Sequence, residues 1–78
     1  MAEHKVIFFY RYVEIEEPEN LVKALREFCV QHSLLGRILV AKEGINGAVC
    51  GREEDIFLFK AHLNEIFHGV GFREQDAS

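Results

Sequence analysis

The chain has 78 residues, of which nine are Lys or Arg and thirteen are Asp or Glu, giving a formal net charge of −4. This length allows one domain at most, or a piece of a larger protein, and a hydrophobic content of 49% excludes an intrinsically disordered chain. The acidic balance argues against a stand-alone nucleic-acid binder, which normally carries a basic stripe, but allows a domain that assists a nucleic-acid enzyme.

An apolar run, Val6–Tyr10, is followed at once by Arg11. Five apolar residues are too few for the core of a signal peptide or for a membrane span. We therefore expect a cytoplasmic location and no membrane partner. In that reducing compartment the two cysteines, Cys29 and Cys50, are expected to be free thiols.

The segment Val6–Val13 has the β-branched and aromatic composition of a strand. Both of its faces are largely apolar, which predicts a place near the middle of a sheet. Because Arg11 is costly to bury, we expect the residues of the other face to point into the core, namely Val6, Phe8, Tyr10 and Tyr12.

Two helices are predicted from apolar residues that recur at the helical period. The first lies within Glu16–Ser33, and Pro18 suits its first turn, where a missing N–H costs nothing. The second runs over Glu53–Phe67, and the acidic residues at its start favour the positive end of the helix dipole. Cys29 falls on the apolar face of the first helix and is expected to be a packing residue.

Two short strands, Gly36–Ala41 and Asn46–Cys50, are predicted between the helices. We place the reversal of the chain at Lys42–Ile45, where Gly44 can adopt a positive φ. A turn at the dipeptide Asn46-Gly47 is the second choice, because it leaves a very short returning strand before Gly51.

The element order predicts an α+β fold, a ferredoxin-like (acylphosphatase-like) βαββα(β) sandwich in a single domain over residues 1–78. This fold needs a fourth strand beside the first, and Val70–Gln75 is a weak candidate, so the fourth strand is expected to be weak or truncated. Without it the Val6–Val13 edge would be bare, which predicts self-association through that edge unless Val70–Gln75 covers it.

Three functional interpretations are weighed and set aside. Cys50 precedes a helix, where a thiol pKa can fall, but the acidic residues at 53–55 oppose a thiolate, so no catalytic residue is expected. An RNA-recognition motif needs aromatic residues on the third strand, and none is present. An acylphosphatase needs a glycine- and arginine-bearing phosphate loop after the first strand, where this chain has "EIEEPEN". The four histidines show no metal-like spacing, and we expect no metal or cofactor in this chain.

The stretches "FFYRYVEIEEPENLVKALREFC" and "LLGRILVAKEGINGAVCG" resemble the N-terminal domain of the rhodanese-fold tRNA uridine hydroxylases. The likeness rests on Phe9-Tyr10-Arg11-Tyr12 and on Gly36-Arg37 followed by Glu43-Gly44-Ile45-Asn46, and it extends over about Phe8 to Phe67. The resemblance implies a fragment of a longer, rhodanese-related oxidoreductase for tRNA processing. A downstream rhodanese domain would then carry the reactive cysteine, and molecular oxygen would be the co-substrate of the parent enzyme.

The resemblance further implies that this chain is a non-catalytic module, which packs on the rhodanese domain or helps to position tRNA. Our hypothesis for RNA contact names Arg11, Arg37, Lys42 and Asn46. The turn motif Glu43, Gly44, Ile45, Asn46 and Gly47 is expected to be structural, with the Glu43 and Asn46 side chains bonding to the backbone. The alternative is a protein-interaction or regulatory module without an RNA role.

Overall fold

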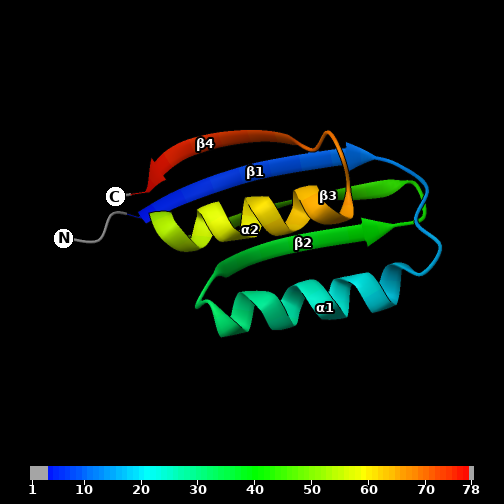
Figure 1. Ribbon diagram of the computed structural model, residues 1–78, viewed down its shortest axis with the longest axis horizontal. Coiled ribbons are helices and arrows are strands. Elements are labelled where there is room, and N and C mark those ends of the chain that lie inside the picture. The colour runs from blue at the N-terminus through cyan, green and yellow to red at the C-terminus, as the bar shows by residue number, and fades with distance from the viewer. Residues whose placement is uncertain (1–3, 78) are drawn as a thin grey trace.

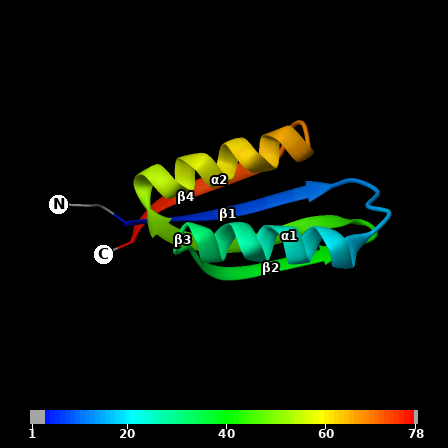
Figure 2. The ribbon, with the colours of Figure 1, turned by 60° about the horizontal axis from the view of Figure 1, so that its bottom comes forward.

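A computed structural model describes residues 4–77 of the chain. Its elements, shown in Figure 1, are β1 (His4–Tyr12), α1 (Pro18–Gln31), β2 (Leu35–Ala41), β3 (Gly44–Arg52), α2 (Glu53–Ile66) and β4 (Gly71–Ala77). The strands form one sheet in the order β2-β3-β1-β4, and each neighbouring pair is antiparallel. Both helices lie on the same side of this sheet (Figure 2). The predicted ferredoxin-like α+β fold is confirmed.

The core lies between the helices and the sheet. Phe59 of α2 is fully buried, and its ring centroid lies 5.5 Å from that of Phe9 on β1 and 6.0 Å from that of Phe28 on α1. The buried apolar side chains are Ile7, Phe9, Ile15, Leu25, Leu34, Ile45, Val49, Ile56, Phe59 and Leu63. One face of the sheet therefore supplies the core, and the other is left without helices.

The first helix begins and ends as its sequence predicts. Pro18 occupies its first turn, and the chain leaves it through Ser33, which has a φ of 55°. The amide of Leu34 donates to the carbonyl of Cys29 at 2.8 Å, and the amide of Ser33 donates to that of Val30 at 3.3 Å. This pair of bonds is a Schellman motif, in which a serine takes the left-handed position that glycine usually fills.

The predicted inward face of β1 was wrong. Ile7 and Phe9 are 0% and 2% exposed, whereas Tyr10 and Tyr12 are 59% and 80% exposed. Arg11 shares the inward face with Ile7 and Phe9 but lies one residue before the end of the strand. At that position its guanidinium donates to the carbonyl of His68 in the loop after α2, and Arg11 is only half-buried.

The expectation of a weak or truncated fourth strand was also wrong. β4 pairs with β1 from Gly71, opposite Tyr10, to Ala77, opposite His4. Its residues are polar because β4 is an edge strand, and ion pairs hold it: Lys5–Asp76 at 2.5 Å and Lys60–Glu74 at 3.5 Å. Since β4 covers β1, the condition for self-association through a bare β1 edge is not met.

Candidate functional site

The turn between β2 and β3 is a tight hairpin corner. Ala41 pairs with Gly44, so the loop consists of Lys42 and Glu43 alone. It lies within the predicted reversal Lys42–Ile45, and the returning strand begins two residues earlier than predicted, at Gly44. Asn46 and Gly47 lie within β3, which excludes the second choice. Gly44 has a φ of +154°, and a Cβ there would collide with the carbonyl oxygen of Arg11. Glycine is required here because the end of β1 packs directly against the corner.

Backbone groups hold this corner in place. The amide of Val13 donates to the carbonyl of Glu43 at 3.1 Å, and the amide of Ile15 donates to the carbonyl of Lys42 at 3.0 Å. Among residues 4–77, the side chains of Glu43 and Asn46 make no hydrogen bond, so the roles expected for them were wrong. The corner is a structural junction whose exposed side chains face outwards.

We call the face of the sheet without helices the open face. The strand registers place there every second residue of each strand. Its members are His4, Val6, Phe8, Tyr10 and Tyr12 of β1, Leu35, Arg37, Leu39 and Ala41 of β2, Gly44, Asn46, Ala48, Cys50 and Arg52 of β3, and Gly71, Arg73 and Gln75 of β4.

The open face is cationic in an acidic protein. It carries Arg37, Arg73 and, at the end of β3, Arg52, which forms an ion pair with Glu54 of α2 at 3.0 Å. None of its members is an aspartate or glutamate, although the chain has thirteen acidic residues. Arg37 and Arg73 lie in one row across the sheet, on opposite sides of Ala48 and Phe8. Phosphate groups are therefore favoured ligands for this face rather than for the rest of the surface.

Three aromatic side chains line the open face along β1. Phe8, Tyr10 and Tyr12 are all exposed, and the ring centroids of the two tyrosines lie 6.1 Å apart at an interplanar angle of 58°. The guanidinium carbon of Arg73 lies 5.4 Å from the centroid of Phe8. A hollow of about 350 Å³ opens beside the hairpin, between Tyr10, Tyr12, Leu39 and Asn46, with Glu43 at its rim.

The four residues named for RNA contact do not all converge. Arg37 and Asn46 share the open face, and Lys42 is exposed at the tip of the hairpin. Arg11 points to the other side of the sheet, where its Nε donates to the carbonyl of His68 and its Nη1 to that of Tyr12, both at 3.0 Å. Sequence reasoning missed Arg73, which lies on the strand expected to be weak, and it missed the aromatic row, which the correct alternation of β1 would have indicated.

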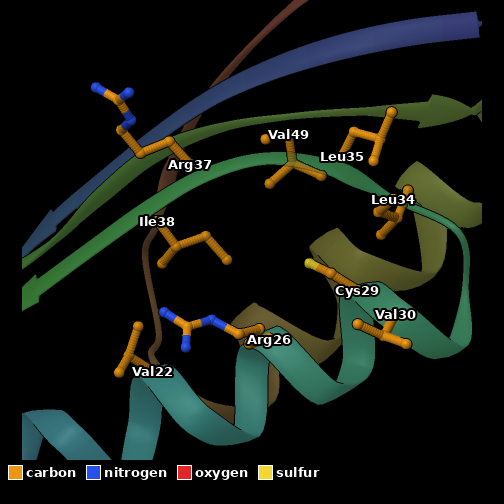
Figure 3. A pocket seen from close by; sticks show the side chains of 10 residues that line it. Val22, Arg26, Cys29, Val30, Leu34, Leu35, Arg37, Ile38 and Val49 are labelled. Carbon is orange, nitrogen blue, oxygen red and sulfur yellow. The ribbon is translucent and has the colours of Figure 1, made fainter.

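A second cleft, of about 320 Å³, lies between α1 and β2 (Figure 3). Arg26 and the thiol of Cys29 point into it from α1, while Arg37 points away from it (Figure 3). Burial raises the pKa of the Cys29 thiol above its ordinary value of 9.0. This thiol is therefore a poor nucleophile at neutral pH, in keeping with the packing role expected for Cys29.

Among residues 4–77, the other titratable groups form pairs such as His32 Nδ1 with Asp55 Oδ1, 3.4 Å apart. Cys50 lies half-buried on the open face, and the ring of Phe28 lies between the imidazoles of His32 and His62, with centroids 4.3 and 4.5 Å away. Within residues 4–77, no three His, Cys, Asp or Glu side chains are grouped as metal ligands would be. Within the same residues, neither helix is long and apolar enough to cross a membrane.

Residues 4–77 match the family described as the UPF0176 acylphosphatase-like domain. The chain belongs to this family. The β1–α1 connection of this chain carries Glu14, Glu16 and Glu17 and neither glycine nor arginine. A de novo designed protein, Foldit4, shares the fold with a TM-score of 0.63 at 13% identity, over 97% of each chain.

Relatives of this UPF0176-type domain are named tRNA uridine(34) hydroxylase. The protein from Staphylococcus carnosus is 39% identical over 96% of this chain, and the one from Shouchella clausii is 41% identical over 91%. The aligned regions make up 24% and 23% of those proteins. The chain thus spans about a quarter of the length of the curated relatives it matches.

Proposed function

We propose that this domain is a non-catalytic module of a tRNA uridine(34) hydroxylase and that it helps to position the tRNA through its open face. That the ligand is tRNA is inferred from the names of the relatives. The observation that carries the positioning role is the separation of charge, which leaves arginines but no aspartate or glutamate among the strand residues of the open face of an acidic chain. Basic side chains on such a face bind the RNA backbone and fix its register.

The proposal assigns different tasks to the residues named from the sequence. Arg37 and Asn46 contact RNA from the open face, and Lys42 extends that surface at the hairpin tip. Arg11 supports the shape of the domain through its bonds to backbone carbonyls. The hydroxylation itself, with molecular oxygen as co-substrate, belongs to the rest of the parent protein, where a rhodanese domain would carry the chemistry.

The test uses the full-length protein that carries this domain, with Arg37→Gln and Arg73→Gln combined. Because each arginine neutralises one phosphate, the slope of log affinity for tRNA against log salt concentration should decrease by about 1.4. The matched control combines Lys23→Gln and Arg26→Gln on α1, which removes the same charge on the other side of the sheet. Equal slopes for the two double variants would reject the open face as the RNA contact.

A second candidate is a docking module for another domain or protein, without an RNA role. It is favoured by the exposure of Leu35 and Leu39, which are 75% and 56% exposed on the open face. Under this candidate, Leu39→Asp would lower the thermal stability of the full-length protein and leave tRNA affinity unchanged. Under the RNA proposal, the arginine variants lower tRNA affinity at an unchanged melting temperature.

A further inference from the structure

We propose that the open face binds unpaired nucleotides, with bases stacked on Tyr10 and Tyr12 and phosphates held by Arg37 and Arg73. This inference rests on the proposed function and deepens it, because it states which form of RNA is recognised and by which side chains. Aromatic rings stack on unpaired bases whatever their sequence, and such a surface becomes selective for single strands when positive charges flank it.

The ring of Tyr10 is held in position by its neighbours. A Cβ placed on Gly71, its partner on β4, would lie 2.9 Å from Cε1 and 3.1 Å from Cζ of Tyr10. The ring therefore lies closely over the glycine backbone, which limits its rotation. A side chain fixed in this way loses little conformational freedom when a base stacks on it, so the platform is organised before RNA binds.

The two tyrosines border a hollow of suitable size for a single ring system. Its volume is about 350 Å³, near the lower end of the range for small-molecule sites. Asn46 lines the hollow directly opposite Tyr10 in the β1–β3 register, and its amide makes no hydrogen bond with any residue in 4–77. An amide offers both donors and an acceptor, so it can bond to the edge of a base that stacks on Tyr10.

The arginines flank this platform in the next row of the sheet. Arg37 on β2 and Arg73 on β4 are separated by three strand spacings, or about 14 Å. Side chains at that separation contact different phosphates of one RNA strand. The sugar-phosphate backbone of that strand would therefore cross the sheet, with its bases facing β1. Arg73 also lies over the ring of Phe8, which adds a flat cationic surface beside the tyrosines.

Double-stranded RNA does not meet these requirements, because its bases are stacked on one another and expose no face to a tyrosine. Bases in loops, bulges and strand ends are free to stack on a tyrosine ring, so the open face should bind these parts of an RNA. The arrangement also differs from an RNA-recognition motif, since the open-face residues of β3 are Asn46, Ala48 and Cys50 and none is aromatic. Base contacts would therefore follow β1 alone.

The test measures the affinity of this chain for a short fluorescein-labelled oligouridine by anisotropy, with an RNA duplex as the comparison ligand. Tyr10→Ala and Tyr12→Ala should each weaken oligouridine binding by about 5- to 100-fold. Phe57→Ala is the matched control, because Phe57 is a 69% exposed aromatic residue on α2, away from the open face. Gly71→Ala leaves both tyrosines in place but displaces the Tyr10 ring, and it should also weaken binding.

The outcomes separate this inference from the proposed function. If the tyrosine variants bind like Phe57→Ala while Arg37→Gln and Arg73→Gln lose affinity, the positioning role stands and base stacking is rejected. Equal affinity for duplex and oligouridine also rejects stacking. If neither the tyrosine nor the arginine variants change the binding of oligouridine or tRNA, both proposals fail. Protection of Tyr10 from oxidative labelling in the full-length protein without RNA would then show that another part of the protein covers the open face. Thermal melts above the assay temperature establish that each variant is folded.

Discussion

The guanidinium of Arg11 donates from Nε to the carbonyl of His68 at 3.0 Å and so ties the end of β1 to the loop that joins α2 to β4. This loop delivers β4 to the edge of β1. Arg11 therefore helps to complete the sheet on which the open face is built, although its own side chain lies on the other side. We therefore propose a structural role for Arg11 in the "FYRY" segment.

Replacing Arg11 tests this structural role. Arg11→Gln removes a charged donor from the carbonyls of His68 and Tyr12, and we expect the free energy of unfolding to decrease by about 1 kcal/mol. Urea denaturation of the 78-residue chain measures the change. Arg26→Gln on α1 is the control, because Arg26 makes neither of these bonds. A loss confined to RNA affinity, with stability unchanged, would contradict the assignment.

Ser33 offers the opposite prediction, a stabilising substitution. Its φ of 55° is unfavourable for a residue with a Cβ and suits glycine, so Ser33→Gly should raise the free energy of unfolding by about 0.5–1 kcal/mol. Ser33→Ala, which keeps the Cβ, should bring no such gain. The two variants are compared by their urea midpoints, and equal midpoints would show that the helix end is not strained.

Gly44 tests the close packing of the hairpin corner. Gly44→Ala combines a disfavoured φ with a collision against the carbonyl of Arg11, and we expect a loss of about 2 kcal/mol or more. Gly69→Ala is a matched control, since Gly69 also has a positive φ, of 81°, but nothing lies within 4 Å of its Cβ position. If both variants lose the same stability, the collision contributes nothing and only the dihedral angle matters.

The raised pKa of Cys29 predicts a dependence of stability on pH. Burial penalises the thiolate, so the folded protein holds the thiol proton to higher pH than the unfolded chain does. Stability is therefore fully present below the unfolded thiol pKa and decreases as pH rises above it. Chemical denaturation between pH 7 and pH 10 should show this decrease, and Cys29→Ala should reduce it. A slope that is the same in both proteins would argue against Cys29 as its source.

Much of the fold follows from local signals in the sequence. Pro18 and the apolar period define α1, and Gly44 marks the hairpin, because each signal acts within a few residues. The candidate for β4, Val70–Gln75, was judged weak because an edge strand needs few apolar residues, and the ion pairs of β4 with Lys5 and Lys60 are visible only in three dimensions. The inward face of β1 was misassigned because alternation alone does not reveal that Arg11 stands where the strand leaves the core.

The candidate site was only partly predictable for the same reason. Arg37 and Asn46 are nine residues apart in sequence, and only the β2–β3 register places them on one face. Arg73 belongs to the strand that was expected to be weak, so its place beside Phe8 could not be foreseen. With β1 assigned the wrong way round, Tyr10 and Tyr12 were counted as core and not as surface.

The most direct measurement of the central claim is a titration of the ¹⁵N-labelled chain with oligouridine, followed by amide chemical shifts. The account predicts shifts at Phe8, Tyr10, Tyr12 and Asn46 on the open face, and none at Phe57 on the exposed side of α2. Shifts that cluster on the helices, or an open face that does not respond while the full-length protein still binds tRNA, would contradict the claim that this face contacts RNA.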